Sequence, residues 1–119
     1  MSKERRTPGR GRLDRSHEWI DARSLALAEA VGERIRADPS LLDVARKNLL
    51  RWRRRMHPWP HVLQEWEAIL AEGSADEILA ALVSDSEEGR RLRQSSPFAG
   101  ILTPAERKEI FDRYEEIGT

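Results

Sequence analysis

The sequence contains no cysteine in its 119 residues and no long apolar run. The missing cysteine excludes disulfides, thiolate catalysis and zinc sites with cysteine ligands. The longest apolar run, residues 78–83, is far shorter than the roughly 20 residues of a membrane-spanning helix. The arginine-rich beginning of the chain also has no apolar stretch of the kind found in a secretory leader. We therefore expect a cytoplasmic protein with no membrane contact.

Motifs that mark common enzyme classes are absent as well. The sequence has no G-x-S-x-G nucleophile motif, no Walker-type phosphate loop and no dinucleotide-binding glycine pattern. The adjacent acidic pairs, Glu87-Glu88 and Glu115-Glu116, point about 100° apart on a helix and cannot share one site. We therefore expect a protein that is not an enzyme and needs no cofactor.

His57, His61 and Glu65 follow one another at four-residue intervals, a spacing that gathers metal ligands when all three lie on one helix. Pro58 and Pro60 interrupt that helix, because proline donates no backbone hydrogen bond and disfavours a helical residue before it. We call the segment His57-Pro58-Trp59-Pro60 the joint between the second and third predicted helices. We interpret the two histidines as solvated residues at this joint and expect no metal site.

From residue 19 onward, apolar residues recur every three or four positions, and no alternating strand pattern of useful length appears. A chain of this size with 39% hydrophobic residues can build one modest core. The sequence therefore predicts an all-α protein, a single compact bundle of about five to six helices over residues 19–119. Residues 1–18 have six Lys and Arg and few apolar side chains, which predicts a flexible, disordered basic arm.

The first helix is predicted from Asp21 to about Ala37. Asp38-Pro39 supplies a cap and a proline at the first helical position, so a second helix begins there after a tight turn. We expect the two helices to form an antiparallel hairpin or a bent pair within a basic segment, residues 19–56. One face of the second helix carries its apolar residues: Leu41, Ala45, Leu49, Trp52 and Met56.

Capping residues divide the acidic part, residues 61–119, into further helices. The two prolines of the joint stop the second helix, and a third helix ends at Gly73. Residues 74–77 form a capping box, in which a serine and a glutamate each satisfy a backbone donor at the start of a fourth helix. A weaker helix follows around residues 87–94, and a second capping box at 103–106 begins the last helix.

The formal net charge is zero, but the two halves of the chain have opposite charge. Residues 1–57 carry 15 Lys and Arg against 8 Asp and Glu, a net +7, and residues 58–119 carry 6 against 13, a net −7. The basic half can present a surface to nucleic acid or to an acidic protein. Alternatively, the two halves attract each other in the folded chain.

The predicted second helix carries a dense basic run with no acidic residue inside it. On a helix these cations cover the sides and back of the apolar stripe, where they could neutralise several phosphates in salt-dependent nucleic-acid binding. Alternatively, they complement the helix dipole and pair with Glu65, Glu67 or Glu72 of the next helix. The predicted nucleic-acid-binding residues of this run are Arg46, Lys47, Arg51, Arg53, Arg54 and Arg55.

Arg10-Gly11-Arg12 in the arm resembles the core of an AT-hook, a motif that enters the minor groove of DNA. Leu13 stands where that motif has proline, so the resemblance covers three residues only. We predict Arg10 and Arg12 as further nucleic-acid contacts. The alternative is an arm that only keeps the chain in solution or docks on a partner.

Four of the aromatic residues are tryptophan. Trp52 and Trp66 lie on apolar stripes and are predicted core residues. Trp59 lies between two prolines and Trp19 precedes the predicted first helix, so each is predicted to be a partly exposed anchor for a partner. For Trp59, the alternative is that its ring packs over the joint.

The loop before the last predicted helix has the most distinctive sequence. Residues 93–107 read RQSSPFAGILTPAER, and two shorter segments accompany them, RSLA at 23–26 and DPSLL at 38–42. In these segments the chain resembles small bacterial helical proteins that are encoded beside toxin genes, in the manner of antitoxins. The resemblance spans roughly residues 20–117 and assigns no site residues.

This resemblance implies that the chain neutralises a toxic enzyme encoded by a neighbouring gene, with nucleotidyltransferase-type toxins among the expected partners. An ordered loop would cover the active site, a task that needs affinity and no chemistry. Alternatively, the loop is an internal connector whose apolar residues seal the core. We thus predict antitoxin-like protein binding first, nucleic-acid binding as the alternative, and a homodimer as an assembly state. The predicted partner-binding residues are Trp59, Ser96, Pro97, Phe98 and Leu102.

Overall fold

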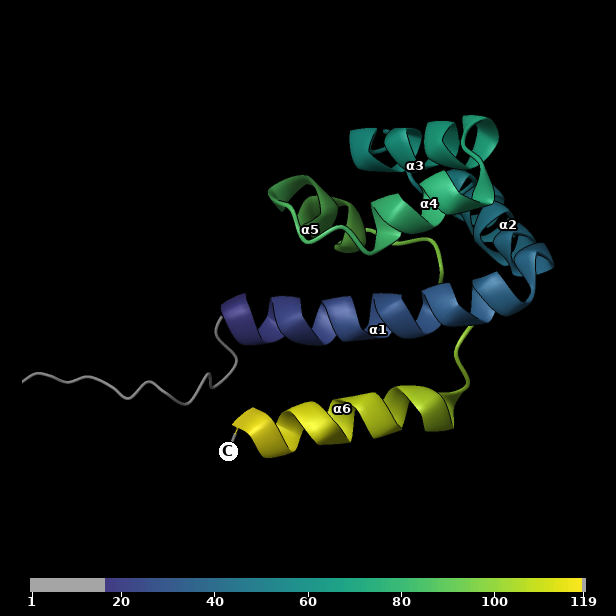
Figure 1. Cartoon of the computed structure of the whole chain (residues 1–119). Helices are drawn as coiled ribbons and strands as arrows, with labels where there is room; N and C mark the ends of the chain where they lie inside the picture. The colour runs from purple at the N-terminus through teal and green to yellow at the C-terminus, as the bar shows by residue number, and fades with distance from the viewer. Residues whose placement is uncertain (1–16, 119) are drawn as a thin grey trace, which may run out of the picture.

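The computed structural model describes residues 17–118, and all regular structure within them is helical, which confirms the predicted all-α fold (Figure 1). Most of the predicted basic arm, including Arg10 and Arg12, lies outside the described residues. The elements are α1 (His17–Ala37), the short 3-10 helix η2 (Pro39–Leu41), α2 (Leu42–Arg53), α3 (His61–Glu72), α4 (Ala75–Leu82), α5 (Glu87–Arg93) and α6 (Pro104–Gly118). None of these helices combines the length and apolar character needed to cross a bilayer.

Helix α1 begins at His17, ahead of the predicted start at Asp21, so Trp19 lies inside the helix. Trp19 is only 1% exposed, and its indole Nε1–H donates to the backbone oxygen of Tyr114 in α6 at 2.9 Å. The prediction that Trp19 is a partly exposed anchor is therefore wrong, because α6 packs along α1 (Figure 1) and its backbone accepts the indole hydrogen bond. The Arg23 guanidinium also lies over this ring, 4.8 Å from its centre.

Helix α2 packs mainly on α3 and makes few contacts with α1, so α1 and α2 form the bent pair and not the antiparallel hairpin (Figure 1). The bend is stabilised by Asp38, whose carboxylate accepts a hydrogen bond from the backbone N–H of Ser40 at 3.2 Å. Helix α2 ends at Arg53, earlier than predicted. Met56 consequently lies beyond the helix and is 40% exposed, although the periodicity placed it on the apolar face.

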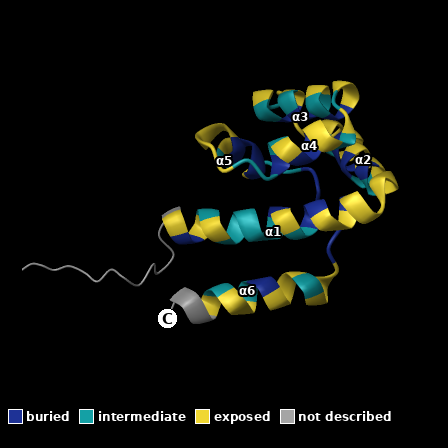
Figure 2. Cartoon of the chain, in the orientation of Figure 1, coloured by how far each residue is buried: buried dark blue, intermediate teal, exposed yellow. Residues whose placement is uncertain are grey.

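A single cluster of buried residues joins all the α-helices of the described chain and the loop before α6 (Figure 2). Trp66 of α3 lies fully buried in this core, as the sequence predicted. Its Nε1–H donates to the backbone oxygen of Leu92 in α5 at 2.9 Å, and its ring makes a T-shaped contact with the ring of Phe98, with the ring centres 5.4 Å apart. Trp66 therefore connects α3 with α5 and with the loop.

Both predicted capping boxes are present. The Ser74 hydroxyl accepts from the backbone N–H of Glu77 at 3.1 Å, and the Glu77 carboxylate accepts from the N–H of Ser74 at 2.8 Å. Thr103 and Glu106 make the same exchange at 3.1 and 2.7 Å before α6. Gly73 ends α3 as predicted, and a Cβ at that position would come within 2.8 Å of a backbone oxygen of the helix. These local signals fix where α4 and α6 begin.

Candidate partner-binding surface

The six predicted cations of the basic run divide into two groups, of which the first has acidic partners. Arg46 pairs with Asp43, one turn earlier on α2, at 2.9 Å. Arg53 donates to both carboxylate oxygens of Glu67 on α3, at 2.9 and 3.0 Å. Of the predicted pairs with the acidic residues of the next helix, only the one made by Arg53 is formed within residues 17–118.

The second group has no acidic partner among residues 17–118, and we call it the cation stripe. All its side chains are exposed. Arg51 donates a hydrogen bond to the side-chain oxygen of Asn48, which is a neutral group. Spacings of four, seven and eight residues place the members on one side of α2 and of the turn that follows it. The cation stripe consists of Lys47, Arg51, Arg54 and Arg55.

Trp59 lies half-buried at the joint between α2 and α3. Its indole N–H donates to Glu67 at 3.0 Å, and the Arg53 guanidinium lies over its ring, 5.5 Å from the ring centre. The same carboxylate thus binds both the tryptophan and the arginine. This arrangement agrees with the alternative that the ring packs over the joint, while a role of Trp59 as a partner anchor stays a prediction.

The structure buries three of the four loop residues that were predicted to contact a partner. Pro97 is less than 2% exposed, Phe98 is 4% exposed and Leu102 is 6% exposed. These side chains are buried as the connector alternative supposes: Phe98 and Leu102 belong to the core cluster, and the ring of Phe98 packs on Trp66 of α3. A partner cannot touch them unless the loop moves. Ser96 remains partly exposed and can contribute to a surface.

Asn48 holds this loop in place, and the sequence interpretation missed it. Its Nδ2 donates to the backbone oxygens of Pro97 at 2.8 Å and of Ala99 at 2.9 Å. The side chain is 4% exposed. Its amide group thus supplies hydrogen bonds to two backbone oxygens of the loop, which lie outside any helix. The sequence did contain a signal for this role: Asn48 is a polar residue on the same helical face as the buried Ala45 and Leu49.

An open groove of about 320 Å³ lies where the end of α2 meets the start of α3 and the segment after α5. We call it the joint groove. Its lining is mainly apolar, with polar side chains from the segment after α5. Arg55 follows Trp52 by three positions, about 60° around the helix, whereas Arg51, Lys47 and Arg54 lie about 100° to 160° around the helix from Trp52. The lining residues are Trp52, Met56, Pro60, Leu63, Gln94, Ser95 and Ser96.

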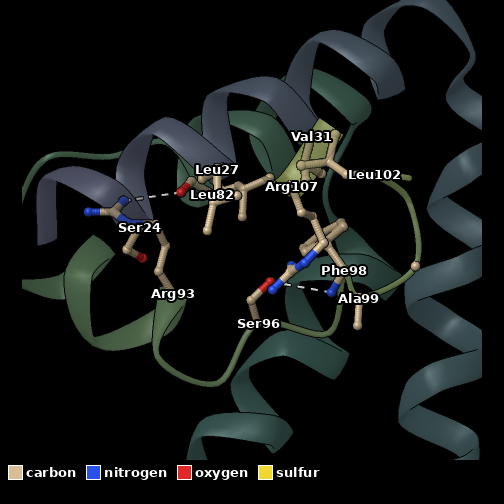
Figure 3. A pocket seen from close by; sticks show the side chains of 12 residues that line it. Ser24, Leu27, Val31, Leu82, Arg93, Ser96, Phe98, Ala99, Leu102 and Arg107 are labelled. Carbon is tan, nitrogen blue, oxygen red and sulfur yellow. Dashed lines mark hydrogen bonds between the residues drawn. The ribbon is translucent and has the colours of Figure 1, made fainter. Parts of the chain in front are cut away.

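A smaller cavity of about 170 Å³ lies between α1, the end of α4 and the loop, with Ser24, Ser96 and Arg107 at its edge (Figure 3). Arg93 also lines it, but its guanidinium donates to the backbone oxygens of Leu82, at 3.1 Å, and of Ser84. Burial lowers the pKa of this arginine. Since carbonyls at a helix C-terminus lack partners within the helix, Arg93 serves as a cap for α4.

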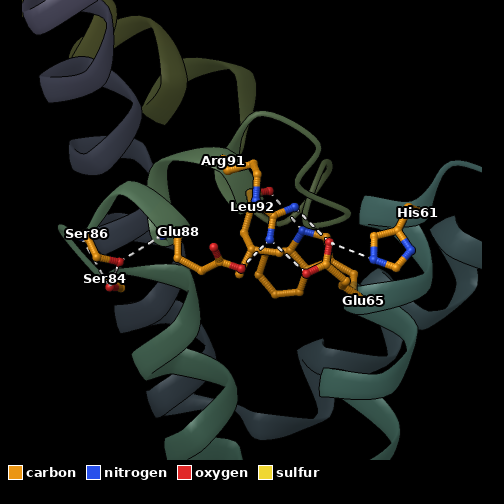
Figure 4. Close-up of polar contacts among 9 residues, drawn as sticks. His61, Glu65, Ser84, Ser86, Glu88, Arg91 and Leu92 are labelled. Atoms are coloured by element: carbon orange, nitrogen blue, oxygen red, sulfur yellow. Dashed lines mark hydrogen bonds and ion pairs between the residues drawn. The ribbon is translucent and has the colours of Figure 1, made fainter.

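The histidines of the joint do not gather a metal site. Glu65 accepts hydrogen bonds from Arg91 of α5 at 2.7 and 2.8 Å, and Arg91 also pairs with Glu88 (Figure 4). The hydrogen bonds from Arg91 lower the pKa of Glu65. His61 is exposed and stands 3.9 Å from the same carboxylate. Within residues 17–118 there is no group of three side chains suited to a metal ion.

No model of a known protein family, no curated protein and no solved structure matches this chain. The joint groove and the cation stripe are therefore the features from which a function can be inferred. They combine an accessible apolar lining with four positive charges that lack acidic partners in the described chain.

Proposed function

We propose that this protein is antitoxin-like and neutralises a toxic enzyme by binding it. The proposal is carried by one observation: the joint groove opens at the end of α2, the helix that also carries most of the cation stripe. Large apolar side chains and arginines that are left without internal partners are the residue types that dominate the energetics of protein interfaces. Here both types occur on α2 and the turn that follows it.

The wall of the groove is already ordered before a partner arrives. Asn48 binds the loop through two backbone oxygens, and Arg53 ties α2 to α3 through Glu67. A surface that is held in this way loses little conformational entropy on binding. Inhibition by contact needs such affinity and requires no reactive group.

Co-expression with the product of the neighbouring gene tests the proposal. In a bacterial host, expression of that product alone should arrest growth, and co-expression of this chain should restore growth. The two proteins should also co-purify as a complex, and sedimentation of the complex would measure whether this chain is present as the predicted homodimer. Continued growth arrest together with the absence of a complex would refute the proposed function.

Nucleic-acid binding is the second candidate, and the cation stripe favours it. Four cations without acidic partners can contact phosphates, while the acidic half of the chain opposes a polyanion. Reversing three charges in the variant Arg51→Glu/Arg54→Glu/Arg55→Glu should weaken binding of a DNA duplex and reduce the slope of log K against log salt by about 2 to 3. Fluorescence anisotropy at several salt concentrations measures both quantities, and an unchanged slope would assign the stripe to another role.

A further inference from the structure

We infer that the cavity between α1, the end of α4 and the loop before α6 is a binding site for a small oxyanion, meaning a phosphate or a carboxylate group. The cavity has a volume of about 170 Å³ (Figure 3). Two arginines and two serines contribute to its lining, and none of the lining residues that the structure describes is acidic. The inference goes beyond the proposed function and does not depend on it. The four polar residues are Ser24, Arg93, Ser96 and Arg107.

Arg93 brings a buried positive charge to the cavity. This residue is 7% exposed, and its Nη1 donates to the backbone oxygens of Leu82 and Ser84. Its other two guanidinium nitrogens, Nε and Nη2, are buried and have no hydrogen-bond partner within residues 17–118. Buried charged groups normally have such partners, because a charge that loses water without gaining a partner is costly. The described chain therefore satisfies this guanidinium only in part.

Arg107 reaches the same cavity from α6. Its side chain points toward Ser96 in Figure 3, and it forms no ion pair and no hydrogen bond with the described part of the chain. The guanidinium lies 5.4 Å from the centre of the Phe111 ring, and this aromatic contact holds the side chain near the cavity. The five N–H donors of Arg107 remain for a ligand.

Two hydroxyl groups complete the set of donors. Ser24 of α1 is half-buried, and its hydroxyl makes no hydrogen bond with any other residue of the described range. The hydroxyl oxygen of Ser96 accepts from the backbone N–H of Phe98 at 3.3 Å, so its own O–H can donate to a ligand. Donors from α1, from α6 and from the segment after α5 thus meet at one cavity.

The nearest carboxylates leave the cavity with an excess of positive charge. Burial lowers the pKa of Arg93, and the charges of Asp85 and Asp21 oppose this change only in part. Both carboxylates lie close to a different cation, Arg90, at 3.6 and 3.7 Å from its guanidinium. Neither of them lines the cavity.

The type of donor and the size of the cavity define the ligand. A guanidinium presents N–H groups in a planar fork that fits the oxygens of a phosphate or a carboxylate. The cavity is smaller than the roughly 300 to 1,000 Å³ of pockets that hold drug-sized ligands, so it suits one small anion. Because Nε and Nη2 of Arg93 are enclosed, the anion acts on Arg93 mainly through its charge, and direct hydrogen bonds come from Arg107 and the two serines.

Thermal unfolding of the full-length protein tests the inference with inorganic phosphate and with succinate. Sodium chloride keeps the ionic strength constant, so that general screening does not change between samples. An anion that binds only the folded chain should raise Tm by about 5 °C when its concentration is about ten times Kd. A response to phosphate alone assigns the site to phosphate groups, and a response to succinate alone assigns it to carboxylates.

NMR spectra of the protein labelled with nitrogen-15 give a second measurement. The side-chain Nε–H signals of Arg93 and Arg107 should move in a saturable manner as the anion is added. The corresponding signal of Arg113, which does not line the cavity, should stay in place.

Variants of the full chain connect the response to the cavity. Arg107→Gln should weaken binding of the anion by at least about tenfold, and Ser24→Ala by about threefold. Arg113→Gln removes an exposed arginine from the same helix and should change binding by less than about twofold. Arg93 is retained in all variants because it also caps α4. Circular dichroism establishes that each variant keeps its helical content.

Three results would overturn the inference. The first is that neither anion raises Tm in a saturable manner at concentrations up to about 10 mM, where a bound anion with a Kd of about 1 mM would show its full effect. The second is an equal response of Arg107→Gln and Arg113→Gln. The third is a movement of all arginine signals together, which would reveal general screening of charge in place of a site.

Discussion

At the scale of single residues, Asn48 holds the loop before α6 against α2. It lies on the buried face of α2 and reaches across the core to the loop before α6, where its amide group donates to two backbone oxygens. Its own side-chain oxygen accepts from Arg51, a member of the cation stripe. One buried amide thus links the position of the loop to the position of a surface charge.

Replacing Asn48 by alanine is expected to lower the free energy of unfolding by about 2 kcal/mol, because the buried carbonyl of Pro97 and the partly buried carbonyl of Ala99 lose their donor. Urea denaturation followed by circular dichroism measures the change. Gln94→Ala removes an exposed amide nearby and should leave the free energy within about 0.5 kcal/mol of the unaltered protein. Equal stability of the two variants would mean that the apolar side chains alone hold the loop.

At the scale of the element, the capping boxes matter most for the short helices. Helix α4 has 8 residues, too few to be stable in isolation. Its buried residues, Ile78, Leu79 and Leu82, give it tertiary support, and the exchange between Ser74 and Glu77 satisfies backbone donors at its start. Helix α6 also begins with a capping box, but it has a long contact with α1 in addition.

Ser74→Ala should therefore lower the free energy of unfolding by about 1 kcal/mol, since the backbone N–H of Glu77 loses its acceptor. Ser95→Ala is the matched control, because the hydroxyl of Ser95 makes no hydrogen bond within residues 17–118. Thermal and urea unfolding of both variants give the comparison. A loss of the same size in the two variants would contradict the capping role.

At the scale of the whole molecule, ion pairs connect the basic and the acidic half of the chain. Arg53 pairs with Glu67, Arg34 pairs with Glu106, and Arg90 lies 3.7 Å from Asp21. The expectation that the halves attract each other is thus met at these contacts, while the cation stripe stays outside them. Pairs as exposed as these contribute little individually.

The protein should lose stability in acid. Hydrogen bonds from Arg91 lower the pKa of Glu65, and the backbone N–H of Thr103 lowers the pKa of Glu106. A carboxyl group whose pKa is lower in the folded state stabilises the fold above its usual pKa of 4.5, and this contribution is lost as the pH falls through the folded-state value.

The free energy of unfolding should therefore decrease between about pH 6 and about pH 3, and the decrease should be smaller in the variant Glu65→Gln/Glu106→Gln. Glu33→Gln/Glu109→Gln is the control, because both residues are exposed and form no ion pair within residues 17–118. Urea unfolding at a series of pH values measures the difference. Identical pH profiles of the two double variants would contradict the assignment.

Local signals made much of the fold predictable. Both capping boxes, the C-terminal Gly73 and the helical class of every element lie where the sequence indicated. The predictions failed where the burial of a residue depends on contacts with residues far away in the sequence. Trp19 was placed before α1 because the helical pattern was taken to start at Asp21, and its burial depends on α6, which lies at the other end of the chain.

The candidate site was predicted in part. The basic run was recognised, but six cations were treated as one group, and the apolar loop residues were expected to face a partner. Only the folded chain shows that Arg46 and Arg53 have acidic partners and that Phe98 packs on Trp66. The joint groove joins residues from α2, α3 and the segment after α5, so no single stretch of sequence reveals it.

The amino-acid sequence by itself determined the helices and most of their ends, because caps, prolines and apolar periodicity act between residues within about four positions. The tertiary structure alone decided which cations stay without acidic partners, which way the loop turns its apolar side chains and where a groove opens. The physical reason is that these outcomes depend on contacts between residues far apart in the chain, such as the amide of Asn48 and the carbonyl of Pro97.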